Sequence, residues 1–330
     1  MLVALPTAAQ TPATQSPDPA PVRVGPVTIS GYIQADALKV FADDRDETAD
    51  TFRIRRARLA LGGDIAPKIA WNLSVDMAGV TVGLRDAHMT LRLSPQFSIR
   101  IGQFYPRLGL ERLTSTSRLE IIDRTSMTDR ITYERNPGIA FLNLAPYKGW
   151  VTYSIGVWNG PGQNRADNND AKDIVGRLVI SPPTLPGLGF GINGASGDQP
   201  DGWRRRAGVD VLMDRPTFKV AVEALRERFE GQPDRDGYYV LAAYRIHPTT
   251  PTPHFRMLEF AARLASFRDP SAARDATPAS SGVPATTDEI QFGGNYYVNR
   301  NVRLMANLIV PIDDRDAPRS TAIGRLQVIF

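Results

Sequence analysis

The chain has 330 residues, of which 42% are hydrophobic and 22% charged, and its net charge is +4. This length suits a single large all-β unit, and no run approaches the roughly 20 apolar residues of a membrane-spanning helix, which excludes a helical membrane protein. Cysteine is absent, which excludes disulfides and thiol chemistry. The 39 basic residues, of which only five are lysines, form no long block, which weighs against a nucleic-acid-binding tail.

The N-terminal residues are interpreted as a processing region. Residues 1–10 contain an apolar run followed by Thr7, Ala8 and Ala9, a small-x-small pattern that resembles the end of a secretory signal. The alternative is a disordered N-terminus. Residues 11–24 are rich in proline, alanine, threonine and glutamine, so we expect a flexible lead-in there. The folded unit is therefore expected to cover 25–330.

Alternation of apolar and polar residues is the main signal from residue 25 onward. Within 69–78, for example, Ile69, Trp71 and Leu73 alternate with Ala70 and Asn72. A period of two predicts strands, and no segment shows a convincing amphipathic helix. The expected strands cover 27–34, 51–65, 69–78, 86–93, 97–102, 137–147, 149–159, 172–182, 187–196, 204–214, 217–228, 236–246, 255–268, 286–298, 301–312 and 320–330.

The run at 53–58 breaks this alternation. Suppose that these strands form a membrane-spanning β-barrel in which Leu59 and Leu61 face lipid. Arg53 and Arg55 then face lipid as well, at a cost of roughly 2–4 kcal/mol each at the bilayer midplane. We therefore expect a bulge that resets the strand, or a position near the outer rim or a subunit interface. Elsewhere, arginines that alternate with apolar residues point to the other face of their strand and are expected on the lumen wall. They are Arg92, Arg100, Arg263, Arg303 and Arg325.

The longest connection in the first half, 108–136, carries the candidate site. Its interior at 119–122 is too apolar for a loop in water, so we expect the loop to fold into the barrel and constrict it. Arginines there would raise the local concentration of anions. Five acids in the same loop leave the alternative of a paired structural loop with little net field. The candidate constriction residues are Arg112, Arg118, Arg124, Arg130 and Arg135.

The segment at 320–330 alternates and ends in Phe330. Outer-membrane barrels commonly end in a strand with one apolar face and an aromatic residue, so barrel-assembly machinery is an expected partner through Phe330. The alternative is an ordinary half-buried strand.

The expected connections alternate in length. Short ones lie at 66–68, 94–96, 183–186, 214–216 and 299–301, and long ones at 43–50, 108–136, 160–171, 197–203, 230–236, 269–287 and 313–319. About sixteen strands of roughly ten residues, with turns on one side and loops on the other, predict a transmembrane antiparallel β-barrel. A soluble β-sandwich would also alternate. Glu259 and Arg263 oppose Phe260 and Leu264, and a charged inner face favours a water-filled lumen over a sandwich interior.

Enzymatic interpretations have little support. His88 with Asp86 and Ser74 or Ser98 could form a hydrolytic triad in the lumen, but polar neighbours are common in such a lumen. Residues 167–170 resemble a fragment of a calcium loop without the glycine and the distal glutamate of a full site. We therefore expect no catalytic residue, no cofactor and no metal.

Several motifs in a fixed order resemble the phosphate-selective porin O and P family. They are FRIRRARL at 52–59, GGDI at 62–65, LRDA at 84–87, IRIGQF at 99–104, GLER at 109–112, GVWNG at 156–160 and DIVGR at 173–177. The match is strong over 25–180 and continues as strand rhythm to Phe330. The resemblance implies a sixteen-stranded outer-membrane barrel that forms homotrimers, with a loop folded into the pore and arginines along an anion path.

The function that this resemblance implies is passive diffusion of small anionic solutes such as phosphate. Family members that bind phosphate also use lysines at the pore, whereas no lysine lies between Lys68 and Lys148 here, so arginine would have to bind the anion. The expected partners are small anionic solutes, outer-membrane lipid and further copies of the chain, with no nucleic acid. The alternatives are a lumen-based hydrolase in the outer membrane and a structural barrel that does not conduct.

Overall fold

The computed structural model describes residues 21–41, 50–250, 252–270, 286–312 and 320–330. The expected signal remnant at 1–10 and most of the expected lead-in at 11–24 lie outside these residues. Within the lead-in, Val22–Val24 form a short strand, β1, that pairs with the start of β2 (Val27–Val40). Large parts of the expected loops at 43–50, 269–287 and 313–319 also lie outside the described residues.

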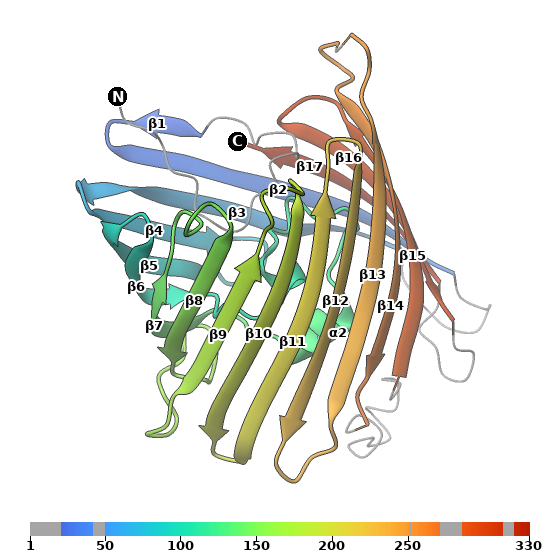
Figure 1. The fold of residues 1–330 in the computed structure, drawn as a ribbon. Coiled ribbons are helices and arrows are strands. Elements are labelled where there is room, and N and C mark those ends of the chain that lie inside the picture. Colours follow the sequence, from blue (N-terminus) through green and yellow to red (C-terminus); the bar gives the residue numbers. More distant parts are fainter. Residues whose placement is uncertain (1–20, 42–49, 251, 271–285, 313–319) are drawn as a thin grey trace.

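Sixteen antiparallel strands, β2 to β17, form one closed barrel (Figure 1), which confirms the predicted fold. Each strand pairs with the next along the chain, and β17 pairs with β2. After β2 the strands are β3 (Thr51–Ala66), β4 (Ile69–Asp76), β5 (Gly83–Ser94), β6 (Phe97–Phe104), β7 (Asn136–Leu142), β8 (Val151–Trp158), β9 (Asp173–Ile180), β10 (Leu188–Gln199), β11 (Gly202–Asp214), β12 (Phe218–Phe229), β13 (Arg235–Ile246), β14 (Met257–Arg268), β15 (Thr286–Tyr297), β16 (Val302–Pro311) and β17 (Thr321–Ile329).

The seam between β17 and β2 closes the barrel. Gly31 and Phe330 exchange both backbone hydrogen bonds, at 2.8 and 2.9 Å. Across the same seam the Arg325 guanidinium donates to both oxygens of Asp36, at 2.6 and 2.8 Å. A Cβ at position 31 would lie 2.7 Å from the Phe330 ring, so only glycine lets the two segments approach this closely.

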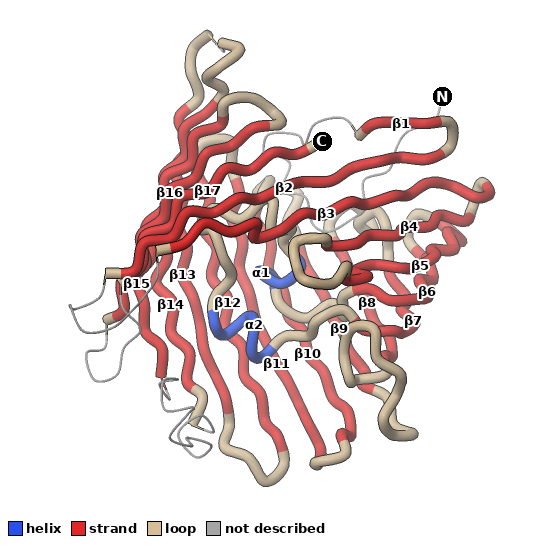
Figure 2. The backbone as a smooth tube through the Cα atoms, turned by 180° about the vertical axis from the view of Figure 1, so that it is seen from behind, coloured by secondary structure: helices blue, strands red, loops and turns tan. Residues whose placement is uncertain are grey.

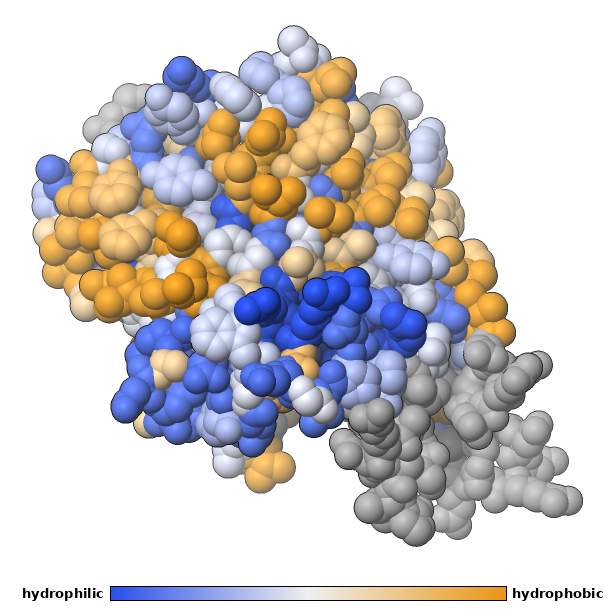
Figure 3. All heavy atoms as spheres, turned by 60° about the horizontal axis from the view of Figure 1, so that its bottom comes forward, coloured by the Kyte–Doolittle hydropathy of each residue, from blue (hydrophilic) through white to orange (hydrophobic). Residues whose placement is uncertain are grey.

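The two faces of the wall differ sharply. Phe260 and Leu264 are 52% and 40% exposed on the outside, whereas Glu259 and Arg263 of the same strand are 1% and 2% exposed and face the lumen. On the face of the molecule that Figure 3 shows, apolar residues form a broad belt, as a bilayer-spanning barrel requires. A charged inner face and an apolar outer face exclude the β-sandwich alternative.

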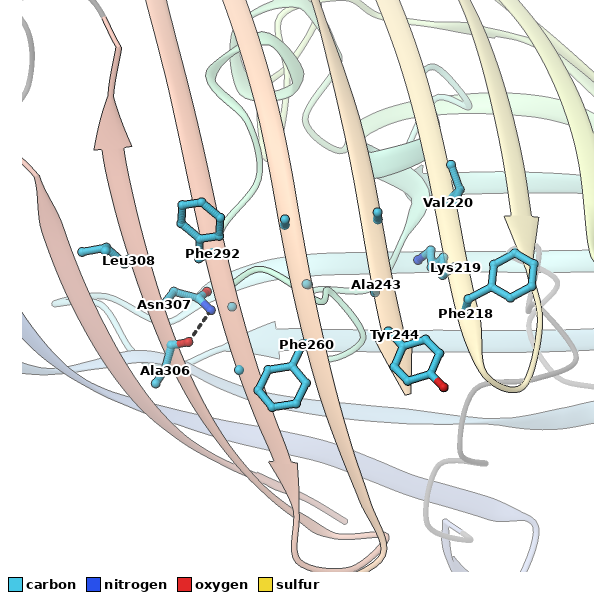
Figure 4. Close-up of a pocket in the computed structure, with 15 residues that line it drawn as sticks. Phe218, Lys219, Val220, Ala243, Tyr244, Phe260, Phe292, Ala306, Asn307 and Leu308 are labelled. Carbon is cyan, nitrogen blue, oxygen red and sulfur yellow. Dashed lines mark hydrogen bonds between the residues drawn. The ribbon is translucent and has the colours of Figure 1, made fainter. Parts of the chain in front are cut away.

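A hollow of about 710 Å³ interrupts this outer belt (Figure 4). Its floor is made of small residues on neighbouring strands, because Ala242 lies opposite Ala262 and Gly294 lies opposite Ala306. Its rim is aromatic, with Phe218, Tyr244, Phe260 and Phe292. The hollow therefore belongs to the membrane-facing surface and not to the lumen.

The alternation of short and long connections is only partly correct. The pair Gln199 and Gly202 closes a tight turn, so the expected long loop at 197–203 is wrong. Gly202 takes a φ of +128° at this turn, a conformation that favours glycine. Conversely, ten residues at 247–256 connect β13 to β14 on the side of the short turns. We call the two sides the turn end and the loop end.

The expected strand at 137–147 is also too long. β7 ends at Leu142, four residues before Pro146, which has no backbone donor for a ladder. A turn follows in which Lys148 and Gly149 have φ values of 51° and 81°. The chain then re-enters the wall at β8.

Candidate functional site

The connection between β6 and β7, 105–135, lies inside the barrel (Figure 2). It carries two short helices, α1 (Leu110–Leu113) and α2 (Ser126–Ile131), and no described helix is long and apolar enough to cross a membrane. Its apolar side chains, among them Ile121 and Met127, are buried in a cluster with residues of β12, β13 and β14. The expectation that this loop folds into the lumen is confirmed, and its apolar stretch is the reason.

Polar wall residues bind the loop backbone. The Glu223 carboxylate accepts hydrogen bonds from the N–H groups of Leu110 (2.6 Å) and Glu111 (3.0 Å). On the other side of the loop, Asn307 accepts from the N–H of Ile122 at 2.5 Å. Further contacts to loop carbonyl oxygens come from Arg303 to Leu119 and from Arg325 to Ile122, both at 2.8 Å. The wall from β12 to β17 therefore holds the loop in one place, and three of the predicted wall arginines take part, since Arg263 donates to the carbonyl oxygen of Asp123.

A β-bulge in β3 sets the direction of the 53–58 arginines. Gln34 lies opposite Arg56 and Ala35 lies opposite Ile54, which leaves Arg55 as an extra residue. Because of this extra residue, the alternation of inward and outward side chains is offset by one residue on the two sides of the bulge. Ile54 therefore faces outward, while Arg53 and Arg56 reach lumen carboxylates. The sequence-based expectation of a bulge is confirmed.

Four guanidinium groups then surround one loop carboxylate, an arrangement that we call the Asp123 cluster. The nitrogen-to-oxygen distances to Asp123 are 3.1 Å from Arg56, 3.5 Å from Arg55, 3.8 Å from Arg325 and 3.9 Å from Arg53. The second carboxylate in contact, Asp36, accepts from Arg325 and from Arg53. Four positive and two negative groups leave a net positive charge.

The ionised state of Asp123 follows from these neighbours. Burial would raise the pKa of the Asp123 carboxyl, but Arg55, Arg56 and Arg325 outweigh burial and lower the pKa below its usual range. Arg53 and Arg55 keep 38% of their side-chain surface exposed, whereas Arg325 is fully buried. Arg53 and Arg55 are therefore the members of the cluster that a solute can reach.

A second group, the Arg107 cluster, joins the loop residue Arg107 to the wall residues Arg100 and Arg177. Burial and, after it, the two neighbouring cations lower the pKa of Arg107 to about 9. Arg100 donates to Thr90 at 3.1 Å, and Arg177 forms a bidentate pair with Asp210. Sequence reasoning missed Arg107, because no periodic pattern fixes the direction of a loop side chain.

Of the five predicted constriction arginines, Arg112 and Arg124 hold the loop itself together, and Arg135 fastens it to the wall strand β5. Arg112 is 2% exposed and pairs with Asp129 and Glu134, each at 2.9 Å. Arg124 donates to the carbonyl oxygens of three loop residues at 2.7 to 3.2 Å. Arg135 pairs with Asp86 at 2.8 Å. Among these three, Arg112 alone is paired with acids of the loop, as the alternative of a paired structural loop describes.

The remaining predicted residues are spread over the lumen. Arg130 is exposed at the end of α2, and Arg118 is half-buried beside Arg245 and Arg303 in a small hollow. Arg263 contacts the loop through Glu111 at 2.5 Å and through the carbonyl oxygen of Asp123 at 2.8 Å. Arg92 pairs with Asp64 at 2.5 Å near the turn end. Of the ten predicted arginines, Arg325 alone belongs to the Asp123 cluster.

The residues of the hypothetical triad are neighbours but lack the hydrogen bonds that a catalytic triad needs. The Ser74 hydroxyl donates to Asp86 at 2.8 Å, so it contacts the carboxylate and not the imidazole. Nδ1 of His88 is buried with no hydrogen-bond partner among the described residues. A general base needs a hydrogen bond to its nucleophile, and this arrangement does not provide one.

Comparisons with known proteins agree with this architecture. The profile of the family described as "Phosphate-selective porin O and P" matches residues 27–225 and 217–322. A protein of Caulobacter vibrioides is 27% identical over 140 residues, which are 39% of this chain and 27% of that protein, so the match covers about a quarter of that relative.

Solved structures share the fold at low sequence identity. OmpF of Salmonella typhi, in complex with daunomycin, is similar with a TM-score of 0.65 and 12% identity, covering 92% of this chain and 97% of that one. The channel DcaP of Acinetobacter baumannii gives 0.63 and 12%, with the same coverage. The anion-selective porin of Comamonas acidovorans gives 0.63 and 14%, covering 92% and 99%. These likenesses show a porin-type barrel.

Proposed function

The chain belongs to the phosphate-selective porin O and P family, and from this premise we propose that it is a channel through which small anions pass beside the Asp123 cluster. Its place is the bacterial outer membrane, where closed barrels with an apolar outer belt reside. The observation that carries the proposal is the excess of guanidinium over carboxylate groups where the loop meets β2, β3 and β17.

This excess has a physical effect on passing solutes. A narrow lumen with low-dielectric walls focuses the field of uncompensated charges, which raises the local concentration of counter-ions. Guanidinium groups also replace part of the hydration shell of an anion by hydrogen bonds. Arg53 and Arg55 are half-exposed, so they can exchange water for solute without unfolding the loop.

We propose that phosphate is a solute of this channel and that arginine alone contacts it at the constriction. Arginine presents a planar fork of donors that fits phosphate bidentately, whereas lysine acts as a point charge. The loop at 105–135 contains no lysine, and the lysine nearest to it on the wall, Lys219, is bound to Glu120 at 2.9 Å. Lys219 is thereby occupied and 7% exposed, which leaves the anion to the half-exposed Arg53 and Arg55.

Planar-bilayer recording tests the proposal. The reversal potential in a potassium chloride gradient should give an anion-to-cation permeability ratio above one, and Arg53→Gln with Arg55→Gln should lower this ratio at least several-fold at low salt, where screening is weakest. The matched control, Arg205→Gln with Arg228→Gln, removes the same charge from the outer surface and should leave the ratio unchanged. A barrel that does not conduct would overturn the proposal.

The remaining proposals concern assembly and processing. We propose a homotrimer, supported by the family and by the trimer form of OmpT of Vibrio cholerae, a solved structure with a similar fold (TM-score 0.59, 10% identity, covering 92% of this chain and 99% of that one). We also propose that residues 1–10 are a signal remnant, residues 11–24 a lead-in and residues 25–330 the barrel. We further propose that barrel-assembly machinery recognises Phe330. In addition, we propose that the protein is not an enzyme. Mass spectrometry of protein extracted from outer membranes measures both the subunit number and the mature N-terminus.

A further inference from the structure

We propose that a patch of arginines on the outer surface, at the loop end of β11 to β14, binds the phosphate groups of a lipid in the outer leaflet. The patch consists of Arg205, Arg226, Arg228 and Arg268, here called the rim arginines. The side chains of Arg226, Arg228 and Arg268 are 54%, 65% and 57% exposed. The proposal depends on the outer-membrane location of the barrel and is independent of what the channel conducts.

The strand register places these four side chains on one face. Arg205 lies directly opposite Arg228, and Arg226 and Arg268 both lie opposite Asp236, on either side of it. Directly opposed side chains in antiparallel strands have Cβ atoms about 5 Å apart, and like charges in such a pair are destabilising. An arginine pair at this spacing on an exposed surface is therefore suited to sharing an anion.

The carboxylates nearby do not balance the patch. Asp234 accepts from Arg226 at 2.6 Å and from Arg228 at 3.2 Å, and Asp236 pairs with Arg268 at 2.5 Å. Two further exposed acids, Asp198 and Glu230, lie one row closer to the loops, where the Glu230 carboxylate accepts from the backbone N–H of Trp203. The rim arginines thus outnumber the carboxylates that contact them by four to two.

Their height on the wall points to lipid and not to a soluble anion. On β12 the outward side chains change from Arg228 and Arg226 to Ala224 and then to the apolar belt toward the turn end. Trp203 and Tyr238, which are 43% and 46% exposed, lie beside the patch, and such aromatic residues mark the interface between headgroups and hydrocarbon. Figure 3 shows hydrophilic residues gathered directly beyond the apolar belt at the loop end.

The chemistry of the patch fits a phosphorylated headgroup. Guanidinium groups bind phosphate oxygens through paired, charge-assisted hydrogen bonds, and basic clusters beside the hydrocarbon boundary bind anionic lipid headgroups. A phosphate between Arg205 and Arg228 would replace their mutual repulsion by two attractions. The methylene stems of the arginines would meanwhile cover apolar surface at the top of the belt.

The test measures lipid binding by the whole barrel in zwitterionic detergent, with a chelator present to remove divalent-cation bridges. The probes are bisphosphorylated lipid A and the same lipid with both phosphates removed, counted as bound lipid per barrel by native mass spectrometry. Arg205→Gln with Arg228→Gln should weaken binding of the bisphosphorylated lipid at least about tenfold, a loss that corresponds to roughly 1.4 kcal/mol. Binding of the dephosphorylated lipid should not change.

The lumen variant Arg53→Gln with Arg55→Gln is the matched control, because it removes the same charge from inside the barrel. It should bind the phosphorylated lipid as the unmodified protein does. Equal lipid binding by the rim variant and the unmodified protein would overturn the proposal, and so would an equal loss in the lumen variant. Conductance of the rim variant, recorded in parallel, should be unchanged, so failure here is distinguishable from failure of the channel proposal.

Discussion

Tyr105 shows how a single residue in the lumen takes its properties from its neighbours. The Arg135 guanidinium lies over its ring, 4.1 Å from the centroid. Burial would raise the pKa of the Tyr105 phenol, but Arg135, Arg124 and Arg112 outweigh it and lower the pKa to about 8. This phenol therefore changes charge within an ordinary experimental pH range.

We predict a pH-dependent selectivity from Tyr105. Below its pKa the phenol is neutral, and as pH rises through about 8 the phenolate adds one negative charge to the lumen. The anion-to-cation permeability ratio should therefore fall across this range, while the pH stays below the pKa of Arg107, about 9. Tyr105→Phe has no titrating group and should give a flat profile, and an equal fall in that variant would contradict the assignment.

Arg124 is predicted to stabilise the loop and not to select anions directly. It donates to the carbonyl oxygens of Glu111, Arg112 and Thr114, and hydrogen bonds from a charged donor contribute about 1.5–3 kcal/mol each. Arg124→Gln should therefore increase proteolytic cleavage of the loop in the folded barrel. Arg130→Gln, an exposed site on the same loop, is the control and should leave cleavage unchanged.

At the scale of elements, the bulge in β3 separates a tolerated deletion from a disruptive one. Removing Arg55 leaves Ile54 opposite Ala35 and Arg56 opposite Gln34, so every pair is retained. Removing Ala60, from the regular part of the strand, would turn the residues on one side of the deletion to the wrong face. Heat-modifiable migration in detergent gels should show a folded barrel for the first deletion and loss of folding for the second.

Strands could be predicted wherever the two-residue alternation of apolar and polar side chains is regular. The alternation of Glu259 and Arg263 with Phe260 and Leu264 fixes both the strand and its faces. The misplaced charges of 53–58 indicated a bulge as one of three explanations, and the structure has the bulge. Turn length was harder, because the wall residues 197–199 are also polar enough for a loop. The partners of Arg112 and Arg124 depend on how the loop folds on itself, and the partner of Arg135 depends on where the loop meets the wall. Strand periodicity carries no information about either.

At the scale of the whole molecule, the loop and the wall are separable. The strand pairs from β2 to β17 are complete without the loop, although Glu223 and Asn307 bind its backbone. We predict that a short glycine–serine link in place of 109–132 leaves the barrel closed, because water can solvate the freed wall groups. Single-channel conductance should rise several-fold and selectivity should fall. Unchanged conductance would show that the loop does not limit the passage.

The seam between β17 and β2 has a consequence for how the barrel folds and closes. Its ion pair joins residues 289 positions apart, so it is among the last contacts that a growing structure can make. A sheet that lacks β17 is not a narrower channel but an open sheet with two unpaired edges, and such edges invite pairing with other chains. Pore, selectivity and freedom from aggregation therefore arise together, in one event, when the first and the last strand of the barrel meet.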